Sequence, residues 1–210
     1  MTDKSSQLPA ERDYLPGMGR HFLLPLYDLL HVVSGLHAIH QEMVTLAGLR
    51  AGHRVLDVGC GTGNLLRATG KRYRDVELSG VDPDVKMLAR AERKFRRAGL
   101  PVRLDRGFAQ ELAYPDGSFD RVFSSLMLHH LDTPSKDEML AEVRRVLRPG
   151  GLLVLADAVH GHGHGHAHLQ DNVGDAVTKR IEAAGFTVEP TRLRKLRVLG
   201  QVGIEVASVH

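Results

Sequence analysis

Tryptophan is absent from this chain, and aromatic residues make up 5% of it. Proteins that stack the bases of single-stranded nucleic acid need several exposed aromatic side chains, so the composition argues against a nucleic-acid partner. Cys60 is the single cysteine, which excludes a disulfide within the chain and fits a reducing compartment, here the cytoplasm. Lys and Arg number 28 against 25 Asp and Glu, and the net charge of +3 gives little support to a strongly acidic partner.

Long apolar runs are absent too. No stretch approaches the ~20 apolar residues of a transmembrane helix, and residues 1–10 are polar, without the apolar core of a secretory signal. Peripheral membrane contact stays open, and nothing indicates an oligomeric state. The 210 residues suffice for one well-filled α/β domain and are too few for two large ones.

Residues 54–64 combine a strand, a glycine turn and the start of a helix. The apolar run Val55-Leu56-Asp57-Val58 fits a buried parallel strand. Gly59, Gly61 and Gly63 follow at alternate positions, where the backbone can turn tightly and a ligand can approach closely. This spacing differs from the dinucleotide fingerprint G-x-G-x-x-G. A generic glycine turn of another α/β protein is the alternative interpretation.

The pattern Asp57-x-Gly59-x-Gly61-x-Gly63 resembles the first motif of the class I S-adenosylmethionine-dependent methyltransferases. Further stretches resemble later motifs of that family, in the family's order: 76–82, 110–120 and 148–155. The resemblance implies that Asp57 and the glycines hold the amino-acid end of S-adenosylmethionine. It also implies that Asp82 accepts hydrogen bonds from the ribose hydroxyls. Asp84 is the better candidate for the N-cap of the next helix.

The family resemblance implies an α/β, Rossmann-like fold. Its seven-stranded, mostly parallel sheet has the order 3-2-1-4-5-7-6, an antiparallel last strand and helices on both faces. The sequence pattern predicts strands and helices that alternate accordingly. Strands are expected at 54–58, 76–81, 102–106, 121–125, 152–158, 187–198 and 201–209, and helices at 63–71, 84–98 and 135–147. On the helix at 84–98, we interpret the basic residues as a solvated face: Arg90, Arg93, Lys94, Arg96 and Arg97.

Residues 1–49 are expected to form a mobile N-terminus and a helical lid, and residues 50–210 a single methyltransferase domain. The segment from Tyr27 to His37 is similar to the N-terminal segment of the quinone-biosynthesis methyltransferases and of some lipid-amine methyltransferases. This resemblance implies a lid that selects the substrate, with Tyr27, His31 and His37 near it. A ligand cluster of His31, His37 and His40 is the alternative to scattered lid histidines.

The sequence departs from the family pattern in two places, and the first concerns the cofactor. Where the family commonly has Gly-Asp-Ala after its third strand, this chain has Gly107-Phe108-Ala109, so the usual acidic contact to adenine is missing. Phe108 and Ala109 are instead expected to contact the adenine ring. Ser124, at the end of the fourth strand, is expected beside the cofactor. His129 and His130 follow it, and either is a candidate general base or a structural residue.

The second departure is a histidine-rich loop over 160–168, in which five histidines alternate mostly with glycine: His160, His162, His164, His166 and His168. This composition is typical of sites for Zn, Ni or Cu ions. An adventitious metal binder without function is the other interpretation. The sequence as a whole predicts a methyltransferase acting on a small or lipid-like acceptor, quinone-type or lipid-amine. A metal-responsive cofactor-binding protein with little turnover is the competing hypothesis.

Overall fold

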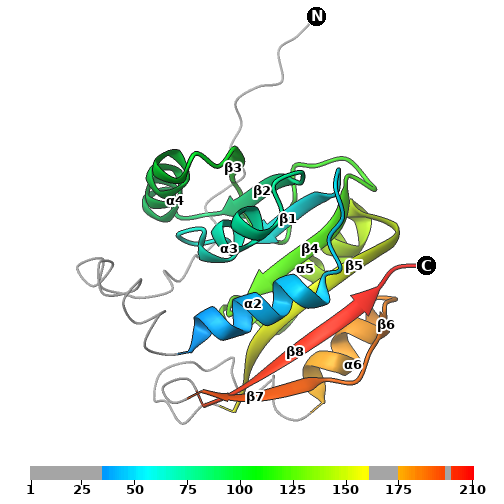
Figure 1. Cartoon of the computed structure of the whole chain (residues 1–210). Coiled ribbons are helices and arrows are strands. Elements are labelled where there is room, and N and C mark those ends of the chain that lie inside the picture. Colours follow the sequence, from blue (N-terminus) through cyan, green and yellow to red (C-terminus); the bar gives the residue numbers. More distant parts are fainter. Residues whose placement is uncertain (1–34, 161–174, 197–199) are drawn as a thin grey trace, which may run out of the picture.

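The computed structural model describes residues 35–160, 175–196 and 200–210. Figure 1 shows an open sheet with helices on both sides. The helices are α2 (Leu36–Leu46), α3 (Asn64–Arg72), α4 (Val85–Ala98), the 3₁₀ turn η2 (Leu128–His130), α5 (Thr133–Val146) and α6 (Ala176–Ala183). The strands are β1 (Arg54–Val58), β2 (Glu77–Asp82), β3 (Val102–Arg106), β4 (Phe119–Ser125), β5 (Leu147–His160), β6 (Thr187–Val188), β7 (Arg192–Leu196) and β8 (Gly200–Ser208).

The sheet has the strand order β3-β2-β1-β4-β5-β8-β6, and β7 also pairs with β8. Strands β1 to β5 are parallel, whereas β8 is antiparallel to β5, β6 and β7. This is the predicted mostly parallel sheet with an antiparallel last strand. The carboxyl ends of β1, β2, β4 and β5 therefore meet at one edge, which is where α/β sheets of this kind bind ligands.

Alternate residues of each inner strand face opposite sides of the sheet, and each side has its own apolar core. On β5, Leu153 and Leu155 pack with α5 and α6, whereas Val154 and Ala156 pack with α2, α3 and α4. Such strands are apolar on both faces, which is why they appear in the sequence as continuous apolar runs. The prediction of helices on both faces is confirmed.

The strand count differs from the prediction, since the expected strand at 187–198 is divided into β6 and β7. Pro190 lies between the two pieces and has no N–H to donate to a neighbouring strand. Both pieces pair with β8, so the predicted order holds once they are counted together. Strand β5 also begins earlier than the expected 152, at Leu147, with an irregularity opposite β4.

The helix boundaries are set by caps that the sequence contains. The Asp84 carboxylate accepts hydrogen bonds from the backbone N–H groups of Lys86 and Met87, which confirms it as the N-cap of α4. Asp132 caps α5 through the N–H of Ser135. Within the described ranges, no helix is both long and apolar enough to cross a bilayer.

Candidate cofactor and acceptor site

The glycine turn after β1 is fixed by hydrogen bonds to the neighbouring strand. The N–H groups of Gly59 and Cys60 both donate to the carbonyl of Val81 on β2. Gly59, Gly61 and Gly63 have φ angles of 72°, 52° and 75°, a region that disfavours other residues. A Cβ at Gly61 would meet no atom of the described residues within 4 Å, so among them this glycine leaves space beside the turn.

Asp57, on β1 just before the turn, has a buried carboxyl group that suits a cationic ligand. The side chain lines a pocket at the sheet edge, and its Oδ1 atom has no hydrogen-bond partner in the described part of the chain. Burial, and secondarily the charge of Asp82, raises the pKa of Asp57 well above its usual value. A ligand ammonium group would offset both effects. The residues present thus fit the amino-acid end of S-adenosylmethionine.

Asp82 ends β2 beside the same turn. Its Oδ2 accepts a hydrogen bond from the N–H of Gly61 at 2.9 Å, and its Oδ1 accepts one from the N–H of Asp84, also at 2.9 Å. Burial raises the pKa of Asp82, and the two backbone donors partly oppose that shift. Each carboxylate oxygen retains a second lone pair for a ligand hydroxyl. The ribose contact stays a prediction that this geometry permits.

A narrow pocket separates the glycine turn from α2. Its lining is Leu36, His40, Asp57, Gly59, Cys60, Gly61, Thr62, Asn64, Leu65, Ser125 and Leu126. The volume is about 50 Å³, far below the ~300 Å³ of a small-molecule site. The side chains that line the pocket would therefore have to move outward before a nucleoside could enter. Helix α2 supplies a wall of this pocket from outside the sheet.

Three residues of the pocket lining were not assigned to the cofactor site from the sequence: His40, which was expected in the lid, and Ser125 and Leu126 at the end of the fourth strand. His40 Nε2 lies 3.0 Å from Ser125 Oγ, so α2 is tied to the end of β4. Leu126 has a φ angle of 54°, which costs a non-glycine residue about 1–2 kcal/mol. Such strain concentrates at functional sites. In the sequence, the feature that could have placed Ser125 and Leu126 at the site was their position at the end of a predicted strand.

Beyond Leu126, η2 brings His129 against a carboxylate of the next strand. The Nδ1 atom of His129 lies 2.5 Å from Asp157 Oδ1, and the His129 backbone N–H donates to Asp157 Oδ2 at 2.8 Å. Asp157 is 2% exposed on β5 and also accepts the N–H of Ala158. The ring of His130 is tilted against that of His129, with centroids 4.1 Å apart. The structure thus gives the two candidate bases different surroundings.

The other predicted cofactor residues lie around this edge without lining the described pocket. Ser124 is buried, and by strand alternation it faces the side opposite Ser125. Phe108 is half-buried in the turn after β3, and Ala109 packs in the core on the α5 side. Gly107 of that turn donates its N–H to the carbonyl of Asp82, so the turn lies beside the end of β2. Their contacts to adenine stay predictions.

The predicted lid and metal residues are mostly outside the described ranges. Tyr27 and His31 lie there, as do His162, His164, His166 and His168; His160 ends β5. His37 is exposed on α2, whereas His40 is buried. Among the residues that the structure describes, no group of three or more His, Cys, Asp or Glu side chains could hold a metal ion.

The last glycine of the turn gives a stability prediction. A Cβ at Gly63 would lie 2.3 Å from the buried ring of Phe95, at a φ of 75°. Gly63→Ala is therefore expected to lower the free energy of unfolding by about 2 kcal/mol or more, measured by urea denaturation. Gly52→Ala is the matched control, since Gly52 has a φ of 79° and an added Cβ would meet no atom of the structurally described residues within 4 Å. An equal loss in both variants would contradict a specific contact with Phe95.

Comparison with known proteins agrees with this geometry. A family described as a methyltransferase domain matches residues 55–151, and the N-terminal family of anamorsin matches residues 109–196. The ubiquinone/menaquinone biosynthesis C-methyltransferase UbiE of Cupriavidus necator is 30% identical over 201 residues, which cover 88% of this chain and 82% of that protein. The methyltransferase GfsG of Streptomyces halstedii is 40% identical over 125 residues, and the match spans 57% of this chain but 42% of that longer protein.

Solved structures with the same fold are also found. An S-adenosylmethionine-dependent methyltransferase from Aquifex aeolicus superimposes with a TM-score of 0.70 at 23% identity, over 90% of this chain and 97% of that one. At this identity the likeness concerns the fold alone. The family assignment comes from the motif order, the cofactor-edge geometry and the UbiE match taken together. The chain belongs to the class I S-adenosylmethionine-dependent methyltransferases and resembles the quinone-biosynthesis members among them.

Proposed function

We propose that the protein methylates a phenolic, quinol-type acceptor, and that His129 held by Asp157 is the general base. The observation that carries this proposal is the contact of 2.5 Å between His129 Nδ1 and Asp157 Oδ1 at the carboxyl edge of the sheet. A buried carboxylate that accepts a hydrogen bond from one ring nitrogen fixes the tautomer, so that the other nitrogen is the basic one. A quinol is such an acceptor, because its hydroxyl group must lose a proton to become strongly nucleophilic.

In this proposal the chain's own residues bind and orient both reactants. Bound S-adenosylmethionine supplies a methyl group on a positively charged sulfur, ready for in-line displacement. Asp57 holds the ammonium group at one end of the cofactor, and Asp82 holds the ribose hydroxyls. The protein's further contribution is to align the acceptor and to keep water out, which accounts for much of the rate enhancement in such reactions.

The proton balance assigns a role to each partner of the pair. The acceptor's O–H bond breaks, and Nε2 of His129 takes that proton while Asp157 stabilises the imidazolium cation that forms. The phenolate then attacks through a ring carbon or through oxygen, forming the new bond to the methyl carbon as the sulfur–carbon bond breaks. Transfer to carbon also requires the later loss of the proton that the ring carbon carried.

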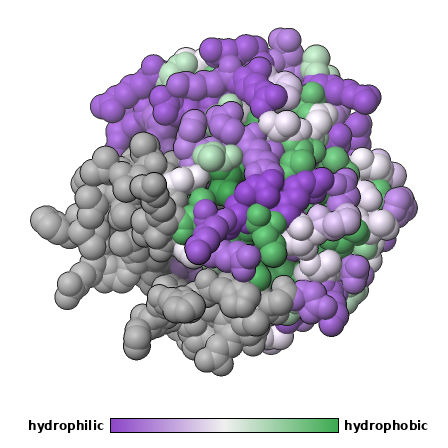
Figure 2. All heavy atoms as spheres, turned by 60° about the horizontal axis from the view of Figure 1, so that its bottom comes forward, coloured by the Kyte–Doolittle hydropathy of each residue, from purple (hydrophilic) through white to green (hydrophobic). Residues whose placement is uncertain are grey.

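The apolar residues of the pocket lining favour an apolar acceptor. Leu36, Leu65 and Leu126 contribute to the pocket lining. Figure 2 shows hydrophobic atoms gathered in the middle of one face of the molecule, between hydrophilic areas. The similarity to UbiE, a C-methyltransferase of ubiquinone/menaquinone biosynthesis, favours a quinone-type acceptor over a lipid amine. In this proposal α2 belongs to the lid expected over residues 1–49, and it is the helix of that segment which the structure describes.

The test is transfer of labelled methyl from S-adenosylmethionine to defined acceptors. We expect label in a chemically reduced, demethylated naphthoquinone with a prenyl tail, and at least tenfold less in the oxidised quinone, whose hydroxyl proton is absent. A phospholipid with a primary amine headgroup serves as the alternative acceptor. Label in the amine lipid and none in the quinol would overturn the acceptor proposal while leaving the family assignment intact.

A further inference from the structure

Positive charge is concentrated on one part of the molecule. Residues 85–106, which form α4 and β3, contain eight Lys or Arg and two Asp or Glu, a net charge of +6. The whole chain carries +3, so the remaining residues together are net negative. The field at α4 is therefore much stronger than the overall composition indicates.

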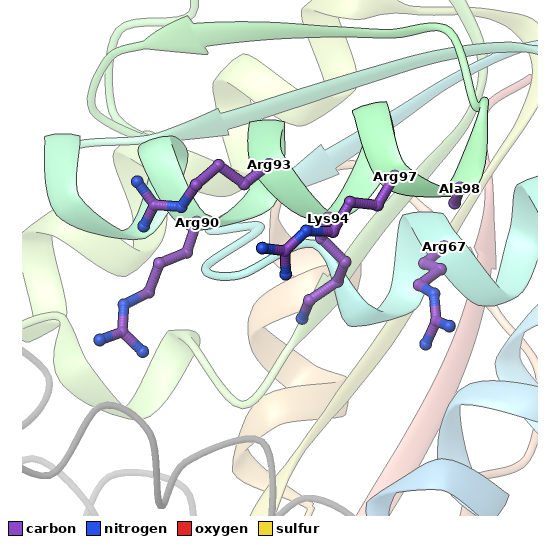
Figure 3. Close-up of a pocket in the computed structure, with 6 residues that line it drawn as sticks. All are labelled: Arg67, Arg90, Arg93, Lys94, Arg97 and Ala98. Carbon is purple, nitrogen blue, oxygen red and sulfur yellow. The ribbon is translucent and has the colours of Figure 1, made fainter.

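The basic side chains of α4 line a hollow rather than a flat solvated face. A cavity of about 440 Å³ lies between α3 and α4, lined by Arg67, Arg90, Arg93, Lys94, Arg97 and Ala98, and we call it the basic groove. Figure 3 shows Arg90 and Lys94 extending from α4 to the same side as Arg67 from α3. A volume of this size is within the range of small-molecule sites.

The four arginines of the groove have no acidic partner within 35–160, 175–196 and 200–210. None of the ion pairs there includes Arg67, Arg90, Arg93 or Arg97, although other arginines pair with carboxylates. Like charges that line one cavity repel each other, and a bound anion offsets that repulsion. Guanidinium groups bind phosphate through two parallel hydrogen bonds, so phosphate matches this lining better than a single carboxylate does.

The basic groove is also connected to the cofactor turn. Lys94 Nζ, one of its lining groups, donates to Thr62 Oγ1 at 3.1 Å and to Asn64 Oδ1 at 2.6 Å. Thr62 and Asn64 line the cofactor pocket. The next residue, Phe95, packs directly on Gly63. An anion that draws the ammonium group of Lys94 into the groove would therefore weaken two contacts that hold the turn.

We propose that the basic groove is a binding site for ligands with two or more phosphate groups, and that its occupancy lowers the affinity of the cofactor pocket. The ligand chemistry is the same whether the phosphates belong to a soluble metabolite or to a lipid headgroup. This site is separate from the acceptor site and does not depend on which acceptor is methylated.

Binding of inorganic pyrophosphate to the full chain, measured by calorimetry at low ionic strength, tests the site. The double variant Arg93→Gln/Arg97→Gln is expected to weaken binding by about tenfold or more, as the loss of charged hydrogen bonds implies. The control Lys86→Gln/Arg96→Gln removes the same charge from the same helix outside the groove, and less than about a twofold change is expected. An equal loss in the two double variants would overturn the groove as a site.

Coupling to the cofactor is measured in the same experiment. Pyrophosphate should weaken S-adenosylmethionine binding by about fivefold, and the cofactor should weaken pyrophosphate binding by the same factor. Lys94→Met is expected to abolish this reciprocity while the arginines still bind pyrophosphate. Coupling that persists in Lys94→Met would contradict the route through Lys94.

Two further arms identify the source of the phosphate. Groove-dependent binding to vesicles that contain cardiolipin, a lipid with two phosphates in its headgroup, stronger than binding to pyrophosphate, would assign the ligand to a lipid headgroup. The proposal would be overturned if the protein bound RNA but not pyrophosphate and if both double variants weakened RNA binding equally. All readouts are binding measurements, so they stay informative if the proposed methyl acceptor is wrong. Circular dichroism and urea midpoints check that each variant is folded.

Discussion

His129→Ala is expected to lower kcat for methyl transfer by about 10²- to 10⁴-fold, the usual contribution of a general base. The affinity for S-adenosylmethionine should change little, because His129 is not among the residues that line the described cofactor pocket. Added imidazole should restore part of the activity in the variant, since it can take the acceptor's proton in place of the missing ring. A residue with a structural role alone would not respond to imidazole.

Two further variants separate the pair from its surroundings. Asp157→Asn is expected to reduce kcat on a similar scale, because an amide that donates to Nδ1 favours the tautomer with a proton already on Nε2. His130→Ala is the matched control, as its ring touches that of His129, whereas the contact with Asp157 is made by His129 itself. A loss in His130→Ala that imidazole reverses, with His129→Ala active, would assign the base to His130.

Asp57→Asn is expected to weaken S-adenosylmethionine binding about ten- to a hundredfold, the scale of a charged hydrogen bond. In the native protein the raised pKa of Asp57 means that its carboxyl keeps a proton to a higher pH than in the unfolded chain. A cationic ligand prefers the ionised carboxylate. Affinity should therefore rise as pH increases through this pKa, and binding should release a proton. Calorimetry in buffers of different ionisation enthalpy measures that proton.

The same substitution should act on stability with the opposite sign. Because burial and Asp82 raise the pKa of Asp57, the ionised carboxyl destabilises the fold above that pKa, and the uncharged amide of the variant removes this cost. The variant is thus expected to bind more weakly while unfolding at a higher urea concentration at neutral pH. Glu205→Gln is the control for removing a buried carboxyl with a raised pKa. The Glu205 carboxyl accepts hydrogen bonds from Thr178 and Thr191, which the substitution would also change. A pH-dependent affinity retained in Asp57→Asn would contradict the assignment.

The sequence predicted the parts of the fold that depend on local patterns. The strand–turn–helix at 54–64, the N-cap Asp84 and the antiparallel β8 all follow from apolar periodicity, glycine spacing or the family motifs. The division of β6 from β7 could have been predicted from Pro190, because a proline cannot continue the hydrogen bonding of a strand. The start of β5 at Leu147 could not have been predicted, because the glycines that follow Leu147 are as typical of a turn as of an irregular strand.

The glycine turn was predictable from the sequence, whereas contacts between distant segments around it were not. Asp157 was missed because it belongs to the apolar run of β5 and meets His129 across 28 residues of sequence. His40 was noticed as a lid histidine, but its contact with Ser125 spans 85 residues. On the basic face of α4, Arg93, Arg96 and Arg97 are exposed as predicted, whereas Arg90 and Lys94 are half-buried. That α3 closes it into a groove depends on helix packing, which no local pattern encodes.

Strand β8 also protects the chain while it folds. Until β8 pairs, β5 is an edge strand whose run Leu152-Leu153-Val154-Leu155-Ala156 has unpaired backbone groups. Such an edge, apolar on both faces and without charge over these positions, is a template for aggregation. The closing strand is therefore protective as well as architectural. Shortened forms that end before β8 would leave this template exposed to other copies of the chain.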